Sequence, residues 1–426
     1  MKISCTISKS FRNALPDVSL TLYNDRIQRV KIMTNFVFIS PNFPTNYWMF
    51  CRELKNNGIN VLGIGDQPYD ELSYELKDSL NEYYKVDSLE NYDSVYRAVA
   101  FFIFKYGRID WLESNNEYWL ERDAMLRTDF HITSGFQKEE IEMFRHKSNM
   151  KKYYTAAGIP VARYPLVDDW DGCMQFIEEV GYPLCTKPDN GVGASDTHKI
   201  ENQQDLEYFF ATKDPDILYI MEEFIDGVVD SYDAIVDSNG DPIFESGTVS
   251  PISIMDIVNN NDNAAYHVTS EIPDDLREAG RATVKSFGVK NRFVHFEFFR
   301  LNSDQHIGKA GDVVALEVNM RPCGGITPDM MNYAGSTNVY KIYADMIAYD
   351  SSLQPKVRNG YCAFAGRRYG RDFTYSEGEI FDKYRDCLKA HGPVDEALAS
   401  TMGDYMYLAV FDDEDTMNAF YEDVIC

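Results

Sequence analysis

The stretch from Val313 to Gly325, VVALEVNMRPCGG, combines a strand, two oxygen ligands and an arginine. Its first half, 313–318, is rich in β-branched residues and is typical of a β-strand. Glu317 and Asn319 are two positions apart, so their side chains point to the same face of that strand. A carboxylate and an amide oxygen side by side are ligands that suit Mg²⁺. Arg321 continues the same alternation.

A second strand is predicted upstream, at 292–301, RFVHFEFFRL, and it carries a single acid, Glu297, inside an aromatic run. Burying an acid in so apolar a strand is costly unless it has a partner. If the two strands are neighbours, Glu297 and Glu317 form a two-sided magnesium site. The alternative is that arginines of the same region neutralise these acids, namely Arg292, Arg300 and Arg321. The two strands alone leave both interpretations open.

The composition limits the class of protein. A chain of 426 residues with 44% hydrophobic residues can bury a large core and is expected to form two to four domains. Its net charge of −27 argues against general binding to nucleic acid or membrane surfaces, which are anionic, but allows a local basic pocket for a nucleotide. The longest apolar run, 98–104, is too short to span a bilayer. Eight cysteines without a C-x-x-C pair indicate reduced thiols and a cytoplasmic location.

The first 32 residues differ from the rest, because they hold six basic residues and two acids, a balance of 6 − 2 = +4. A targeting peptide is one interpretation. The preferred one is an upstream extension that precedes a start at Met33. The segment lacks a secretory apolar core, and the sequence from Asn35 is typical of a first β-strand.

From Asn35 onward, strands and helices alternate. The expected elements are strands at 36–40, 60–65 and 109–112 and helices at 47–55 and 92–106. This alternation predicts a doubly wound parallel sheet. The segment 114–117, SNNE, follows a strand at the edge where such sheets bind ligands, so it can contact a substrate or cap a helix. One or two helices follow at 138–157, and a domain boundary is expected near Glu140.

The next segment predicts a phosphate-binding flap. A strand at 182–188 contains Lys187 and continues into the Gly-rich loop 189–196, DNGVGASD, which precedes another strand at 197–200. Gly191 and Gly193 allow backbone amides to approach a phosphate closely, Ser195 adds a hydroxyl donor, and Lys187 supplies positive charge. The chain has no Walker A motif, and an ordinary hairpin loop is the alternative.

The following strand, 218–227, LYIMEEFIDG, ends in Glu222 and Glu223 beside an aromatic residue, an arrangement that suits hydrogen bonding to an adenine. A hairpin at 228–247, a polar loop at 259–263 and a helix at 273–287 then lead to the two acidic strands. Beyond them, helices are expected at 340–347, 377–390 and 415–424 and strands at 361–365 and 405–411. This last part contains no recognisable catalytic spacing and is interpreted as a structural appendage.

Four features therefore occur in a fixed order: a lysine after a helix (Lys147), Lys187 with its Gly-rich flap, the EEFI segment 222–225, and the paired acidic strands. This order resembles the ATP-grasp superfamily, particularly its carboxylate–amine ligases. The resemblance implies an α/β and α+β architecture: a doubly wound N-terminal domain, a two-lobed ATP-grasp domain and a small C-terminal α+β subdomain. The corresponding limits are 1–32 for the extension, 33–139 for the N-terminal domain, 140–353 for the ATP-grasp domain and 354–426 for the C-terminal subdomain.

The resemblance also implies roles for single residues. Lys147 and Lys187 correspond to lysines on the ATP phosphates, and Glu222 and Ile225 to adenine contacts, with Glu223 between them. Asp230 stands where an acid often contacts the ribose. The implied Mg²⁺ ligands, which could also hold Mn²⁺, are Glu297, Glu317 and Asn319. Arg321 resembles an arginine that steadies the phosphoryl group or the substrate carboxylate, although Arg-Pro-Cys-Gly-Gly varies the commoner Arg-Pro-Gly-Gly ending.

The function that the resemblance implies is an ATP-dependent ligase that joins a carboxylate to an amine through an acylphosphate. Amino acids or small peptides are the expected substrates, with no nucleic-acid or membrane partner, and a homodimer is compatible with the family. Two alternatives are kept: phosphoryl or carboxyl transfer on the same fold, and nucleotide binding without chemistry.

Overall fold

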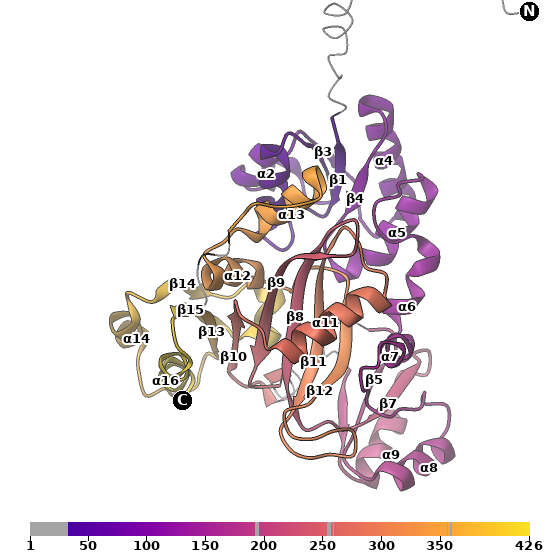
Figure 1. Ribbon diagram of the computed structural model, residues 1–426, viewed down its shortest axis with the longest axis vertical. Coiled ribbons are helices and arrows are strands. Elements are labelled where there is room, and N and C mark those ends of the chain that lie inside the picture. Colours follow the sequence, from indigo (N-terminus) through magenta and orange to yellow (C-terminus); the bar gives the residue numbers. More distant parts are fainter. Residues whose placement is uncertain (1–32, 192–195, 254–256, 259, 356, 358–359) are drawn as a thin grey trace, which may run out of the picture.

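The computed structural model describes residues 33–191, 196–253, 257–258, 260–355, 357 and 360–426 (Figure 1). The predictions for the extension 1–32, and for Gly193 and Ser195 in the flap, lie outside these residues. Within the described residues, the strands form three sheets.

The N-terminal part is a four-stranded parallel sheet in the order β3-β2-β1-β4. Its strands are β1 (Asn35–Ile39), β2 (Asn60–Gly65), β3 (Glu82–Lys85) and β4 (Trp111–Glu113). Its helices are α2 (Trp48–Asn56), α3 (Tyr74–Ser79), α4 (Tyr92–Tyr106) and α5 (Leu120–Asp129). Every residue of β1 and β2 is buried, as expected for parallel strands that are covered on both faces. The sequence did not predict α3 or β3.

A second, small sheet has the antiparallel order β6-β5-β7. It consists of β5 (Leu184–Pro188), β6 (His198–Ile200) and β7 (Tyr219–Glu223), and it packs against α8 (Trp170–Val180) and α9 (Gln203–Thr212). Figure 1 shows this lobe at the lower right, below the N-terminal part. The predicted flap loop joins β5 to β6.

The central sheet has eight strands in the order β12-β11-β8-β9-β10-β13-β15-β14. The first five in the chain are β8 (Gly227–Val236), β9 (Pro242–Ser250), β10 (Ala264–Thr269), β11 (Arg292–Leu301) and β12 (Val313–Asn319). The last three are β13 (Tyr361–Arg367), β14 (Leu388–Pro393) and β15 (Tyr405–Phe411). The C-terminal strands thus extend the central sheet instead of forming a sheet of their own, while the expected domain limits stay predictions.

Helices cover the central sheet and join it to the N-terminal part. One apolar cluster packs α7 (Lys147–Ala156) and α11 (Asp274–Ser286) against β8, β11 and β12. A larger cluster runs from α2 through α12 (Thr327–Gly335) and α13 (Val339–Tyr349) to the central strands. Phe50 of α2 packs its ring 4.7 Å from that of Tyr340 and 5.2 Å from that of Tyr343. These contacts hold the N-terminal sheet beside the central one.

The remaining elements are short or C-terminal. Helical turns occur at η1 (Tyr69–Glu71), η2 (Glu117–Trp119), η3 (Lys138–Glu140), α6 (Glu142–Arg145), η4 (Glu396–Leu398) and α15 (Ala399–Met402). The C-terminal helices are α14 (Glu377–Tyr384) and α16 (Glu414–Ile425). The predicted helix 377–390 is wrong in its second half, because Leu388 and Ala390 pair with Ala409 and Leu408 of β15. Sheet pairing outweighs helix propensity there.

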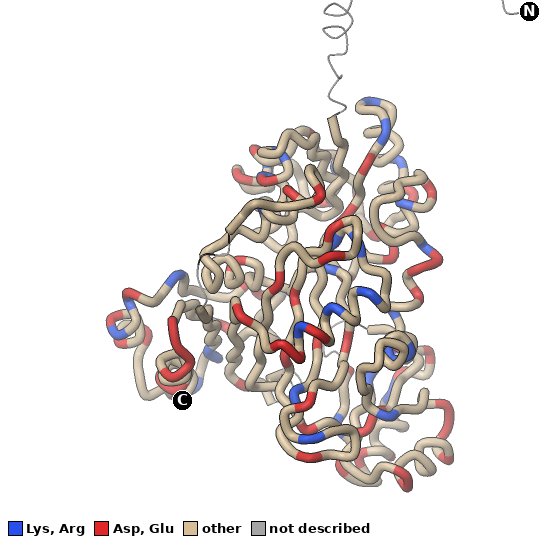
Figure 2. The backbone as a smooth tube through the Cα atoms, in the orientation of Figure 1, with Lys and Arg blue, Asp and Glu red and all other residues tan. Residues whose placement is uncertain are grey.

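The fold class is confirmed: a parallel α/β part is followed by a small antiparallel lobe and a large antiparallel sheet. Among the described helices, none is both long and apolar enough to cross a membrane. Figure 2 shows that acidic residues are spread over all parts of the chain, including α16, in keeping with the net charge of −27.

Candidate functional site

A buried cluster of charges joins α7 to the small sheet. Glu222 of β7 contacts Lys187 of β5 (Oε2–Nζ 2.8 Å) and Lys151 of α7 (Oε1–Nζ 2.7 Å). All three side chains are almost fully buried. In the antiparallel β5–β7 ladder Cys185 pairs with Glu222 and Lys187 with Ile220, so the side chains of Lys187 and Glu222 lie diagonally on one face of the sheet.

The three charges perturb one another. Burial alone would raise the pKa of Glu222, but Lys151 and Lys187 lower it from 4.5 to about 2. Burial likewise opposes the charge on Lys187, yet the neighbouring carboxylate raises its pKa above its ordinary value. Burial lowers the pKa of Lys151. Two cations therefore share one buried carboxylate.

Lys147, at the start of α7, links this cluster to the acidic strands. Its Nζ donates to the carbonyl of Gly191 (2.8 Å) and lies 3.3 Å from Glu317 Oε1. The base of the flap is anchored to the same helix, because Asp189 accepts hydrogen bonds from the amide (2.8 Å) and the hydroxyl (3.0 Å) of Ser148. A carboxylate at a helix N-terminus is favoured by the exposed amides and the helix dipole.

The acidic strands β11 and β12 lie side by side, which meets the condition for a two-sided site. In the β11–β12 ladder Glu297 is paired with Glu317, and His295 with Asn319. The register shifts directly after Glu297. Such a bulge redirects side chains locally. Glu297, Glu317 and Asn319 therefore present three oxygen-bearing side chains on one face, a donor set that fits Mg²⁺ or Mn²⁺.

The arginines of the alternative interpretation mostly contact other groups. Arg300 donates to Asp230 (2.7 Å) and Asp275 (2.9 Å), and Arg292 is bound to Glu113. Glu297 is instead held by a histidine, since His295 Nε2 is 3.0 Å from Glu297 Oε1.

His295 lies between two carboxylates. Its Nδ1 is 2.8 Å from Asp233 of β8, opposite the contact with Glu297. Burial opposes protonation of this imidazole, but Cys323 and Asp233 raise its pKa well above 6.5. Three atoms lie within 4.8 Å of one another here: a ring nitrogen of His295, a carboxylate oxygen of Asp233 and Cys323 Sγ.

Arg321 extends from β12 towards the N-terminal sheet. Its Nη2 donates to Asn319 Oδ1 (3.1 Å), and its Nε lies 3.6 Å from Oε2 of Glu117, which follows β4. Within the described chain, this Glu117 oxygen is buried and has no hydrogen-bond partner. Burial raises the pKa of Glu117 to about 7, although Arg321 opposes the rise. Asn116, in the same segment 114–117, has the capping role: its side-chain oxygen accepts a hydrogen bond from the amide of Tyr118 at the start of η2.

Glu222, Glu223 and Ile225 of the EEFI segment are called the hinge residues, and Glu222 and Glu223 point to opposite faces of β7. Glu222 faces the lysines, whereas Glu223 accepts hydrogen bonds from the backbone amide (2.8 Å) and the Nε (2.9 Å) of Arg163. Ile225 is buried beside Leu301 and Val314. Glu223, Phe224 and Ile225 line a small pocket together with Gln305 and Ile307 of the β11–β12 connection.

Asp230 is not brought to this cluster. It pairs with Phe298 in the β8–β11 ladder, whereas Glu297 pairs with Ser231, so the side chains of Asp230 and Glu297 lie on opposite faces of the sheet. Asp230 is bound to Arg300 beside α11.

Sequence reasoning missed Lys151, His295 and Asp233. Two of them left a signal: Lys151 is four residues after Lys147 and therefore lies on the same helix face, and His295 is two residues before Glu297 on one strand face. Asp233 left no signal, because only strand pairing brings it to His295.

No family model matches the chain. An L-arginine-specific L-amino acid ligase of Bacillus subtilis is 24% identical over 303 residues, which is 69% of this chain and 70% of that protein. The structure of an L-amino acid ligase from Bacillus licheniformis matches with a TM-score of 0.67 at 14% identity, over 92% of this chain and 96% of that one.

A second similar structure is the biotin carboxylase domain of 2-oxoglutarate carboxylase from Hydrogenobacter thermophilus, a dimer with MgADP, ADP and bicarbonate. It matches with a TM-score of 0.62 at 14% identity and covers 89% of this chain and 87% of that one. The two structural matches cover 92% and 89% of this chain, so they concern most of the fold.

Proposed function

We propose that this chain, which has the ATP-grasp fold, is an ATP-dependent carboxylate–amine ligase that joins an amino acid or small peptide to a second one by an amide bond. The observation that carries the proposal is the contact of Lys147 with Glu317. It connects the buried lysines, which suit phosphates, to the oxygen ligands, which suit a metal ion.

The nucleotide is proposed to bind between the small lobe and the central sheet. Lys147 and Lys187 would neutralise its phosphates, in exchange for the carboxylates that hold them in the free protein. The flap would close over the phosphates through Gly191, Gly193 and Ser195, and the hinge residues Glu222, Glu223 and Ile225 would contact the base. Asp230 is left out of this set, because its side chain lies on the other face of the sheet.

The metal is proposed to be held by Glu297, Glu317 and Asn319. When bound, Mg²⁺ or Mn²⁺ supplies positive charge beside the transferring phosphoryl group. The acids are otherwise neutralised in part by Lys147 and His295.

In the proposed reaction, a carboxylate oxygen of the first substrate attacks the γ-phosphorus of ATP, and the bond to ADP breaks. The amine of the second substrate then attacks the acyl carbon of the acylphosphate, loses a proton, and phosphate leaves. Lys187 and Arg321 would neutralise charge that spreads over the phosphoryl oxygens. Because an acylphosphate hydrolyses readily, closure of the flap would serve to exclude water.

The substrate class is inferred from Glu117 and Arg321. A free buried carboxylate oxygen beside a guanidinium suits a zwitterion, whose amino group would face Glu117 and whose carboxylate would face Arg321. The Bacillus subtilis relative, an L-arginine-specific L-amino acid ligase, supports this class and makes L-arginine the first substrate to test.

The test is ADP release from Mg-ATP with L-amino acids offered singly and in pairs, followed by mass detection of a new amide. Release that requires two partners, with a product of the summed mass less water, is expected. Release with one partner or with bicarbonate would instead identify a phosphoryl- or carboxyl-transfer enzyme. Nucleotide binding without release across the panel would contradict the ligase proposal.

Two variants serve as controls. Glu317→Gln is expected to lower turnover on the order of 100-fold, because it removes a proposed metal ligand. Glu201→Gln is expected to keep it, because Glu201 is an exposed carboxylate whose ion pair within the described residues is with Lys199, at 2.9 Å.

A further inference from the structure

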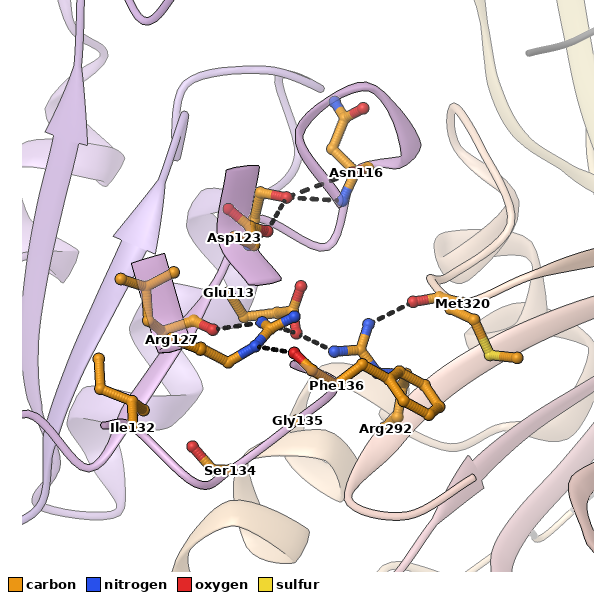
Figure 3. A network of polar contacts seen from close by, with 12 residues as sticks. Glu113, Asn116, Asp123, Arg127, Ile132, Ser134, Gly135, Phe136, Arg292 and Met320 are labelled. Carbon is orange, nitrogen blue, oxygen red and sulfur yellow. Dashed lines mark hydrogen bonds and ion pairs between the residues drawn. The ribbon is translucent and has the colours of Figure 1, made fainter. Parts of the chain in front are cut away.

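We propose that Arg292 is a positioning residue that fixes the distance between Glu117 and Arg321 across the junction of the N-terminal part and the central sheet. This inference rests on the proposed function, since it concerns the substrate end of the same site. Arg292 itself touches neither the proposed metal ligands nor the proposed nucleotide contacts. Figure 3 shows its surroundings.

Arg292 is bound on both sides of the junction. Its Nη1 donates to the carbonyl of Met320 (2.6 Å), the residue between Asn319 and Arg321, and its Nη2 donates to Glu113 at the end of β4. The guanidinium is 3% exposed. One planar group thus ties the end of a central strand to the end of an N-terminal strand, and its fork geometry makes the contact directional.

These contacts close a ring. From Glu113 the chain runs only four residues to Glu117. Glu117 faces Arg321 at 3.6 Å, and Arg321 adjoins Met320, whose carbonyl returns to Arg292. The separation of Glu117 and Arg321 is therefore set by two short chain segments and one guanidinium.

A second guanidinium holds Glu113 in place. Arg127, which is completely buried, donates to Glu113 (3.2 Å), to the carbonyl of Leu112 (2.9 Å) and to that of Phe136 (2.8 Å). Arg127 and Arg292 donate to the same oxygen of Glu113, Oε2, so this one atom joins the two guanidinium groups.

The loop at Gly135 surrounds both guanidinium groups. Gly135 has a positive φ of 99°, and a Cβ added to it would lie 3.2 Å from Arg127 and from Arg292. The ring of Phe136 lies 5.3 Å from the Arg292 guanidinium. A glycine is required here because a side chain would strain the backbone and displace the groups that it encloses.

This arrangement is better explained by positioning than by stability. For a buried ion pair, the free energy lost when both charges leave water can exceed the free energy gained from their attraction. Apolar residues of similar size are therefore often at least as stabilising. The described contacts also leave Arg292 Nε buried without a hydrogen-bond partner and place a second carboxyl, that of Asp123, beside Glu113. Two guanidinium groups at a junction that could have been apolar therefore indicate a need for one fixed orientation.

The test compares Arg292→Lys with Arg281→Met, a control at an exposed arginine of α11 that pairs with Glu245 at 2.7 Å. Lysine keeps the charge but cannot reach both Met320 and Glu113 with a fork. With the amino acid identified by the substrate panel, Arg292→Lys is expected to lower kcat/KM by about 10- to 100-fold, because a small misplacement of substrate groups has effects of this size. The Kd for MgADP is expected to stay at the parent value in both variants.

A second measurement does not depend on activity. Hydrogen exchange of residues 114–119 and 320–325 is expected to become faster together in Arg292→Lys, while 184–188 and 219–223 keep the parent rates. Unchanged exchange in the first two segments would overturn the proposal. Faster exchange with an unchanged kcat/KM would also overturn it, and so would a loss of MgADP affinity as large as the loss of kcat/KM. If the parent protein shows no ligase turnover, the proposed function fails, and the exchange measurement alone decides whether Arg292 positions the two segments.

Discussion

Replacing Glu222 by glutamine tests whether its carboxylate neutralises two buried lysines. The substitution preserves shape but leaves Lys151 and Lys187 without a counter-charge. The lowering of the Glu222 pKa from 4.5 to about 2 corresponds to about 3 kcal/mol in favour of the charged form in the folded protein. Removing one partner of a buried ion pair typically costs about 3–5 kcal/mol, which is similar to the free energy that follows from the pKa of Glu222.

The assay is thermal unfolding at pH 7.5, followed by circular dichroism. For domains of 150–250 residues a loss of 1 kcal/mol lowers Tm by roughly 2–4 °C, so we expect a fall of several degrees. The control is Glu201→Gln, an exposed carboxylate of the same lobe, for which about 0–1 kcal/mol is expected.

The pH dependence gives the sign of the effect. The folded pKa of Glu222 lies below its unfolded value, so its contribution is fully present above pH 4.5 and is lost as the pH falls towards 2. The gap in Tm between parent and Glu222→Gln should therefore be constant from pH 8 to pH 5 and should narrow below that. A fall in Tm for Glu222→Gln at pH 7.5 that is as small as the fall for Glu201→Gln would refute the reasoning. A difference in Tm between parent and Glu222→Gln that widens below pH 5 would also refute it.

Three further predictions concern the metal strands, the substrate end and the core. Glu317→Gln should lower kcat on the order of 100-fold with an unchanged circular dichroism spectrum, since a metal site tolerates the loss of a partner poorly; a parent-like kcat would exclude the metal role. Because the pKa of Glu117 is raised to about 7, its carboxylate forms as the pH rises through 7, so kcat/KM for an amino acid should rise there and the rise should disappear in Glu117→Gln. Gly280→Ala should lower Tm, because the added Cβ would overlap the buried ring of Tyr232. The free energy lost through this overlap is expected to exceed the roughly 1 kcal/mol gained in helix propensity. Gly378→Ala in α14 has open space around the added Cβ and is its control, which should not lose stability.

The fold was largely predictable because its elements are encoded by local periodicity. Alternation along β12 predicted that Glu317 and Asn319 share a face, and the ladder pairs them with Glu297 and His295. The errors fall where local preference and pairing disagree, as in 388–390, where a helical pattern is overruled by pairing with β15.

The sequence by itself determined which residues could form the site. It indicated lysines near a Gly-rich loop, acids on strands and an acidic turn after β4, because the side-chain types and their spacing are visible along the chain.

Only the tertiary structure decided which of these residues meet. It joined Lys151 to Glu222, set Glu117 beside Arg321, and turned Asp230 to the opposite face. It also brought together Glu113 and Arg292, which are 179 residues apart in the chain. The physical reason is that periodicity specifies the face of an element on which a side chain lies, whereas the partner across that face is specified by packing between elements distant in sequence.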